Sequence, residues 1–464
     1  MSDKKTAIIV IHGLGEQRPM DTISSFVGAA WSQDRVLVKA GKDTVWKKPQ
    51  FVSGSFDLRR ITTRKSDVGD GKRMDFFEFY WAHHMQGHKV GQLKAWLFGL
   101  FARSPATVPK SVFGVWMLGV GLMVFGLAVA AISAGLKFGA GFELSPALVA
   151  TASLFPFIGG FLLNKFILPY AGDAERYLVS SPNNVAIRQK IRKEGVKLIA
   201  EITATGEYDR IVLVGHSLGS VIAYDIITFG WSMLDADKME ALHQKDSAAL
   251  KALTAVEDAG TALNAAADGN KEAFLAFRNA QRDYSTTLQG DSDTPFWIVS
   301  DLVTVGCPLS KAEVLLAHDK TDFDERMAQR EFPACPPIYE DGWKGYPGRF
   351  SYPVNAKIRH PHHAAPFGAV VWSNIYVPHK FILIGDVISG PVRHLFGKGV
   401  LDVKIPIKRP FRFMHTKYWS LLKDGKATQA VKALRSALNL AERNTEQEVW
   451  AAYNEEFGAK KGKK

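Results

Sequence analysis

Uninterrupted apolar runs alternate with helix-like segments along this chain. Residues 6–11 (Thr-Ala-Ile-Ile-Val-Ile) form a continuous run rich in β-branched side chains, which is typical of a strand buried on both faces of a parallel sheet. Further strand-like runs occupy 45–64, 74–81, 211–214, 302–309, 372–376 and 400–407, and helices are expected at 21–31, 184–204 and 221–228. This alternation predicts an α/β fold, in which helices flank a mostly parallel sheet.

Two long apolar stretches interrupt the alternation. No charged residue occurs from 111 to 136 or from 144 to 164, and only residues 137–143 join the two stretches. Each is long enough to cross a bilayer, which takes about 20 apolar residues. We therefore expect a transmembrane helical hairpin within 106–170, and a pair of buried core helices is the alternative.

A second insertion, residues 231–292, is rich in alanine and charge. Its apolar residues recur at helical spacing on either side of a break at 268–270 (Met239, Leu242, Leu250, Leu253 and Val256, then Phe274, Phe277 and Tyr284). The spacing predicts an antiparallel helical hairpin. Such a hairpin could cover a substrate pocket or mediate self-association, and the sequence leaves both alternatives open.

The interruptions divide the chain into six segments. An α/β core is expected in three parts, 1–105, 171–230 and 293–425, separated by segments 106–170 and 231–292 and followed by a C-terminal helix and basic tail at 426–464. The chain has 464 residues, of which 47% are hydrophobic and 22% are charged. These values allow a large core and exclude wholesale disorder.

The formal net charge of +12 is concentrated around the apolar stretches. Basic residues precede the first stretch and follow the second (Lys89, Lys94, Arg103 and Lys110; Lys165, Arg176, Arg188, Lys190, Arg192 and Lys193). By the positive-inside rule, this predicts a two-span membrane protein whose folded core faces the cytoplasm. The early first strand leaves no room for a signal peptide, and only two cysteines, Cys307 and Cys335, are present, which fits that location.

The basic charge also bears on partners. Lysines gather near the apolar stretches and in the tail at 460–464, and attraction to an anionic lipid leaflet explains that distribution. We find no nucleic-acid recognition motif, so nucleic acid is not expected as a partner.

The strongest chemical signal is Gly215-His216-Ser217-Leu218-Gly219, which lies between a predicted strand and a predicted helix. A serine on such a sharp strand-to-helix turn presents its hydroxyl clear of the backbone, and the glycines avoid collisions with neighbouring segments. Ser217 is therefore the predicted nucleophile. The residue after the nucleophile, Leu218, is expected to offer its backbone N–H to an oxyanion.

A second signal follows the first strand, where residues 12–17 read His-Gly-Leu-Gly-Glu-Gln. An early strand-to-helix loop can supply the second oxyanion donor, and Leu14 is the candidate. Gly13 and Gly15 keep the loop backbone free to approach the nucleophile. We interpret His12 as structural, not catalytic.

These segments resemble the α/β-hydrolase family, specifically its lipase-like serine hydrolases. Residues 12–17 resemble the oxyanion loop of bacterial lipase-like hydrolases, and residues 215–227 (GHSLGSVIAYDII) are similar to the elbow of intracellular phospholipases A1. Strands at 302–309 and 372–376 fit the same pattern, which spans about residues 6–420 apart from the two insertions. The resemblance implies an α/β-hydrolase fold with a catalytic acid and then a histidine after the serine.

Asp386, in a loop after the 372–376 strand, is the predicted acid, and His415, after the 400–407 run, is the predicted base. Competing bases are His379, His394 and the group His360, His362 and His363, and competing acids are Asp301 and Asp402. Asp225 follows the serine too closely in sequence and is expected to support structure. The three neighbouring histidines lack a further ligand at metal-binding spacing and are interpreted as a loop.

Together, the sequence predicts a membrane-bound serine hydrolase that cleaves carboxylic esters, with lipid or phospholipid acyl esters as substrates and no cofactor or metal. The alternatives are a non-catalytic membrane interaction protein on the same scaffold, and a thioesterase or acyltransferase that uses the same triad.

Overall fold

The protein is described from a computed structural model. It describes residues 4–14, 18–50, 57–85, 174–290, 295–340, 348–355, 357–379, 385–407, 414–442 and 444–456, with isolated residues and short stretches between 99 and 128.

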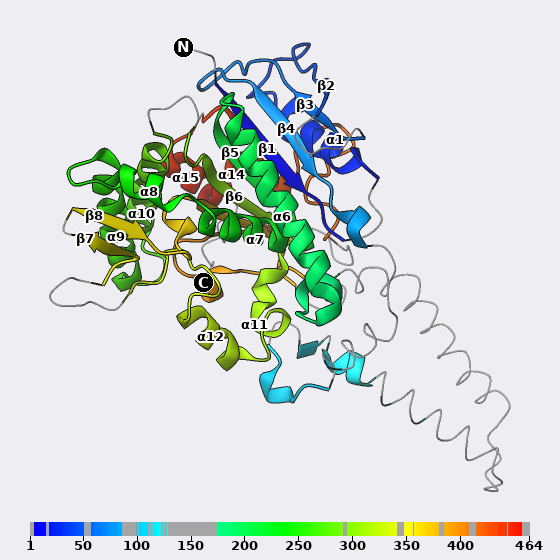
Figure 1. The fold of residues 1–464 in the computed structure, drawn as a ribbon. Coiled ribbons are helices and arrows are strands. Elements are labelled where there is room, and N and C mark those ends of the chain that lie inside the picture. Colours follow the sequence, from blue (N-terminus) through cyan, green and yellow to red (C-terminus); the bar gives the residue numbers. More distant parts are fainter. Residues whose placement is uncertain are drawn as a thin grey trace, which may run out of the picture.

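An eight-stranded, mostly parallel sheet forms the centre of the molecule (Figure 1). Its strands, in spatial order, are β10 (Leu401–Lys404), β9 (Val371–Tyr376), β6 (Val299–Val305), β5 (Tyr208–His216), β1 (Lys5–Ile11), β4 (Met74–Phe79), β3 (Arg59–Thr62) and β2 (Trp46–Pro49). The six strands from β10 to β4 run parallel, and β3 and β2 join them as an antiparallel pair at one edge. The predicted α/β fold class is confirmed.

Helices cover both faces of this sheet. Helices α6 (Pro182–Ala204) and α7 (Leu218–Ser232) lie in front of it in Figure 1, and α14 (Gln429–Leu438) lies behind it. The other α-helices within the described residues are α1 (Asp21–Val27), α8 (Ala236–Leu242), α9 (Ala248–Ala265), α10 (Lys271–Thr287), α11 (Ala312–Leu315), α12 (Lys320–Ala328), α13 (Arg393–Phe396) and α15 (Glu446–Glu456). Because both faces are covered, the central strands have buried side chains on both sides, as their uninterrupted apolar runs predict.

The order of the strands reverses beside β1. After β1 the chain forms β4 on one side, and it later returns to form β5 on the other side. In open α/β sheets, ligands bind at such a reversal, outside the carboxyl ends of the strands. The segments that follow β1 and β5 both begin at this edge.

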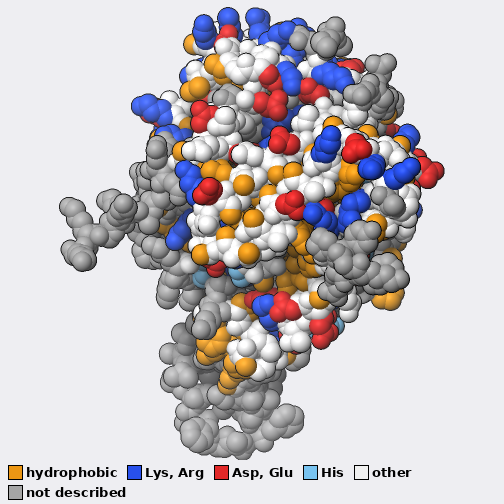
Figure 2. Space-filling view, turned by 90° about the vertical axis from the view of Figure 1, so that its left-hand side faces the viewer, with side chains coloured by type: hydrophobic (Ala, Val, Ile, Leu, Met, Phe, Trp, Pro, Cys, Tyr) orange, Lys and Arg blue, Asp and Glu red, His pale blue; other side chains and the backbone are white. Residues whose placement is uncertain are grey.

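The insertion at 231–292 forms the predicted helical hairpin, with α9 packed against α10 and α8 preceding both. The apolar positions that predicted these helices are largely buried, including Leu253, Phe277 and Tyr284. Figure 2 shows the face of the molecule on which the insertion lies, where basic and acidic side chains are interspersed with hydrophobic ones. Because α10 also contacts β6 and β9, the hairpin is anchored on the sheet.

The interpretation of residues 360–363 as a loop is wrong for His360, which lies in β8 (Ile358–Pro361). Strand β8 pairs with β7 (Ser351–Asn355) in a separate two-stranded sheet, and the His360 ring stacks on Tyr352 at 5.4 Å. Most of β7 is exposed, so these strands carry no continuous apolar run. Their sequence therefore gives little signal for a strand.

Among the described residues, no helix combines the length and the apolar composition that crossing a bilayer requires. Most of segment 106–170, including all of 129–170, lies outside the described residues. The transmembrane hairpin predicted for this segment therefore has no support from the described part of the chain.

A buried network of charges ties α10, the sheet and the C-terminal helices together. The Asp301 carboxylate accepts from Arg210 at 2.8 Å and from Arg282 at 2.6 Å, and Glu446 accepts from Arg282 at 2.9 Å and from Arg278 at 2.7 Å. Burial alone would raise the pKa of Asp301, but the two guanidinium groups outweigh it and hold the pKa well below its usual range. Asp301 is thus an ionised structural group.

We expect Asp301→Asn to lower the free energy of unfolding by about 3 kcal/mol, because it leaves the buried Arg210 without its anion and removes one of the two anions of the partly buried Arg282. Urea denaturation of the purified protein measures this change. Asp324→Asn is the matched control, since its pair with Lys320 is exposed and is worth less than about 1 kcal/mol. Equal effects of the two substitutions would contradict the role given to the network.

Candidate active site

Ser217 lies on a strained turn between β5 and α7. Its φ of 53° and ψ of −128° lie outside the regions that ordinary residues favour. The residues two before and two after it must be glycines: a Cβ on Gly215 would lie 2.5 Å from the Gly219 carbonyl oxygen, and one on Gly219 would lie 2.3 Å from the Ile11 carbonyl oxygen. The spacing of glycines around the serine therefore follows from the close packing of this turn.

The structure brings the three predicted catalytic residues together. Nε2 of His415 lies 2.8 Å from Oγ of Ser217, and Nδ1 of His415 lies 2.9 Å from Oδ2 of Asp386. Ser217, Asp386 and His415 follow β5, β9 and β10, respectively. All three are buried, so their hydrogen bonds are largely protected from competition by water.

Asp386 is held by four donors. Its Oδ2 accepts from His415 and from the Tyr418 hydroxyl at 2.8 Å, and its Oδ1 accepts from the backbone N–H of Ile388 at 3.0 Å and of Ser389 at 3.3 Å. Burial alone would raise the pKa of Asp386, but these hydrogen bonds outweigh it and place the pKa below its ordinary value. Asp386 therefore stays a carboxylate that accepts from Nδ1–H, which leaves Nε2 of His415 free to accept from Ser217.

Tyr418 is a site residue that sequence reasoning missed. Besides bonding Asp386, its hydroxyl lies 3.0 Å from Oγ of Ser389 and accepts from the backbone N–H of Val377 at 3.1 Å. Tyr418 thus links the loop of the acid to the loop of the histidine. Its spacing of three residues after His415 follows no general motif, so the sequence carried no signal for this role.

His216, the residue before Ser217, holds the backbone of the loop that carries His415. Its Nε2 lies 2.7 Å from the carbonyl oxygen of His415, and because a carbonyl only accepts, Nε2 carries the proton. Burial lowers the pKa of His216 to about 3, so the ring is neutral at working pH. His216 therefore fixes the backbone of His415 without adding a charge beside it.

Gly306, which follows β6, is a further site residue that the sequence did not predict. Its φ is +62°, and a Cβ there would lie 2.9 Å from the Tyr418 ring and 3.3 Å from Nδ1 of His415. Only glycine leaves room for both rings. A glycine at the end of a strand is a weak signal by itself, because many such glycines only form turns.

The predicted oxyanion loop lies against the nucleophile. A Cβ on Gly13 would lie 2.8 Å from the Cβ of Ser217, so the backbones approach closely. Leu14 is partly buried against the core, and Leu218 is the first residue of α7, where backbone N–H groups lack helical partners. Gly15 lies outside the described residues.

His12 is a buried structural residue, as predicted. Its ring stacks on Trp81 with centroids 5.0 Å apart, and the Trp81 indole donates to the His12 carbonyl at 3.0 Å. Burial lowers the pKa of His12 to about 4, so the ring stays neutral. These contacts fix the start of the oxyanion loop on the end of β4.

The competing acids are engaged elsewhere. Asp402 accepts from Asn374 and from two backbone N–H groups, Asp225 accepts from Tyr177 and Arg192, and Asp301 belongs to the buried charge network. Among the competing histidines, His362 bonds the Ile338 carbonyl at 2.8 Å, and His394 lies on α13. Ser217 and Asp386 are bridged by His415 instead.

A cavity of about 1260 Å³ lies beside the histidine loop. Apolar side chains form much of its wall (Val377, Ile405, Ile407, Met414, Leu421 and Leu422), and three cations, Lys417, Lys423 and Lys432, and one carboxylate, Asp424, also line it. Met414 and Lys417 flank His415 in sequence. The cavity therefore combines apolar surface with positive charge close to the triad.

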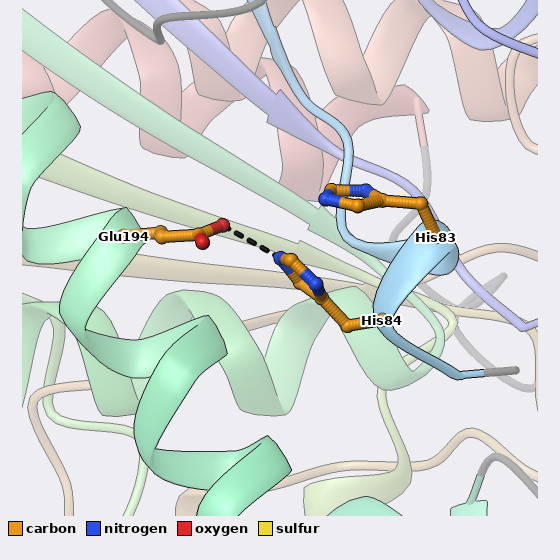
Figure 3. Close-up of side chains that lie close together, drawn as sticks. All are labelled: His83, His84 and Glu194. Carbon is orange, nitrogen blue, oxygen red and sulfur yellow. Dashed lines mark hydrogen bonds and ion pairs between the residues drawn. The ribbon is translucent and has the colours of Figure 1, made fainter.

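Side chains able to bind a metal gather outside the triad, at His83, His84 and Glu194 (Figure 3).

Comparisons with protein-family models, curated proteins and solved structures found no match to this chain.

Proposed function

We propose that the protein is a serine hydrolase that cleaves carboxylic esters. The observation that carries the proposal is the chain of hydrogen bonds from Ser217 through His415 to Asp386, at 2.8 and 2.9 Å. Nucleophile, base and orienting acid lie within hydrogen-bond reach of one another, which is the arrangement that acyl transfer requires. The order serine, acid, histidine along the chain is that of α/β-hydrolases.

The reaction proceeds in two halves. Nε2 of His415 takes the proton of Ser217 as Oγ attacks the ester carbonyl carbon, and the N–H groups of Leu14 and Leu218 stabilise the resulting oxyanion. The imidazolium then protonates the leaving alcohol, the ester C–O bond breaks, and an acyl-serine forms. Water, deprotonated by His415, then attacks the acyl-serine carbonyl carbon; the bond to Oγ breaks, the imidazolium returns the proton to Oγ of Ser217, and the carboxylic acid is released.

The position of the triad in the sheet supports this proposal. Ser217 follows β5, the oxyanion loop follows β1, and the order of strands reverses between these neighbours. This is where open α/β sheets bind ligands. The same strands that position the nucleophile therefore position the oxyanion donors.

We further propose that the substrates are lipid or phospholipid acyl esters. The cavity beside His415 offers apolar walls for an acyl chain and three lysines for an anionic group. The net charge of +12 favours an anionic lipid surface. A membrane location for segment 106–170, with the core on the cytoplasmic side, is part of this proposal and rests on its apolar sequence.

The test is hydrolysis by the purified full-length protein of p-nitrophenyl esters of increasing acyl length, and of phosphatidylglycerol and phosphatidylcholine in vesicles. We expect turnover of esters, an increase in kcat/KM with acyl length, and a preference for the anionic phospholipid. Thioesters tested in parallel distinguish a thioesterase. Failure of folded protein to turn over any ester would contradict the proposed reaction.

A further inference from the structure

Two histidines and a glutamate that do not belong to the triad lie close together (Figure 3). His83 and His84 lie in a short 3₁₀ turn, η2 (Ala82–Met85), directly after β4, and Glu194 lies in the middle of α6. Nε2 of His84 lies 2.7 Å from Oε2 of Glu194, and the His83 and His84 ring centroids are 3.6 Å apart. One potential ligand atom from each residue lies within 4.8 Å of the other two.

We propose that His83, His84 and Glu194 bind a divalent transition-metal cation of the zinc type. Two imidazoles and one carboxylate form a donor set that zinc accepts in three-residue sites, in which water or another ligand completes the tetrahedron. His83 is exposed, so solvent can reach the metal. The site would be independent of the proposed hydrolase activity.

The distances between the three ligand atoms fit such a site after small rotations of the side chains. Metal–ligand bonds of about 2.0–2.2 Å in a tetrahedron place ligand atoms about 3.3 Å apart, and the observed atoms lie within 4.8 Å of one another. The side chain of His84 is only 6% exposed and provides a fixed ligand, whereas that of Glu194 is 40% exposed and is free to change rotamer.

The close approach of the two rings points to a shared ligand. Ring nitrogens of His83 and His84 that lie this close to the Glu194 carboxylate can share one cation with it. Neutral imidazole is the form that binds metals. Lys190, one turn before Glu194 on α6, places a positive charge near His83, so a bound cation must offset its repulsion.

The location gives the metal a structural role. It would join the η2 turn that follows β4 to the middle of α6, two elements that are far apart in sequence. His83 also stacks on Tyr80, which contacts His12 of the oxyanion loop with ring centroids 5.3 Å apart. Metal binding should therefore stabilise the end of β4 against the middle of α6.

The test is calorimetric titration of full-length, chelator-treated protein with Zn²⁺ alone. We expect one zinc per chain, and a loss of affinity of at least about 10–100-fold in His83→Ala, His84→Ala and Glu194→Gln, since even outer-shell changes cost that much. Lys190→Gln should bind more tightly than the wild type. Co²⁺ bound at the site should show the visible absorption of a tetrahedral complex, and His84→Ala should lack it.

Two matched controls keep the result specific. Glu201→Gln changes another glutamate of α6, and His363→Ala changes an exposed histidine elsewhere in the chain; both should bind zinc like the wild type. Wild-type protein that takes up no zinc, or ligand variants that bind it as well as the wild type does, would overturn the proposal. So would loss of binding in His363→Ala. Because the side chain of Glu194 is partly exposed, the Glu194→Gln variant should fold. Labelling of Ser217 by a fluorophosphonate, retained at the wild-type level, would verify this.

Discussion

Replacement of Ser217 by alanine should lower kcat for ester hydrolysis by about 10⁶-fold, because the variant has no nucleophile. The residual rate would come from the oxyanion donors and from substrate binding, which do not depend on the hydroxyl. The measurement is the kcat of purified wild type and variant on the best ester of the acyl series, with unfolding curves to confirm that both are folded.

Ser232→Ala serves as the matched control for Ser217→Ala. Ser232 is the last residue of α7, is exposed, and bonds only a carbonyl of its own helix among the described contacts. It should leave kcat unchanged. If Ser217→Ala kept more than a few per cent of the wild-type kcat, another group would be the nucleophile.

Asp386→Asn should lower kcat by about 10⁴-fold while Ser217 and His415 remain in place. Both oxygens of Asp386 accept hydrogen bonds, Oδ2 from His415 and Tyr418 and Oδ1 from two backbone N–H groups. In the variant, the NH₂ group of asparagine, which cannot accept, must replace one of these two oxygens. It then faces either His415 and Tyr418 or the two backbone N–H groups. If it faces His415, the imidazole carries its proton on Nε2 and cannot accept the proton of Ser217.

The pH–rate profile and a second variant test this explanation. Asp402→Asn changes a buried carboxylate that bonds Asn374 and backbone N–H groups, so it should affect stability more than kcat. In Asp386→Asn, kcat should recover in part at high pH, where hydroxide assists the attack directly. Equal kcat losses in the two variants would show that a buried charge, and not the tautomer of His415, explains the effect.

The sequence predicted the sheet well where strands are buried on both faces. Residues 7–11 and 211–214 lie in strands because their uninterrupted apolar runs have no solvent-facing side. The order of serine, acid and histidine led to Asp386 and His415, and the structure brings both beside Ser217, since each follows a strand of the same sheet and all three strands end at one edge. Local patterns and topology were sufficient here.

Contacts across the fold were beyond the sequence. Tyr418 bonds Asp386 only because two loops meet, and Glu194 lies beside His84 although 110 residues separate them. The acid candidates Asp301 and Asp402 could be set aside only when their partners were known. Strand β8 was missed because an exposed two-stranded sheet needs no apolar run.

The insertion at 231–292 shows a further limit. Helical spacing predicted α9 and α10, but it could not show that Arg278 and Arg282 of α10 pair with Glu446 and Asp301. Those partners lie far apart in sequence and are mostly buried. Whether the hairpin also covers a substrate pocket or mediates self-association stays a prediction.

The most direct test of the central claim is labelling of the detergent-purified protein with a fluorophosphonate, followed by mass spectrometry of the modified peptide. Such a probe reacts with an activated serine whatever the natural substrate is. We predict one adduct per chain on Ser217, and none in Ser217→Ala. Folded wild-type protein that forms no adduct, or that carries it on a different residue, would contradict the assignment of Ser217, His415 and Asp386 as a working triad.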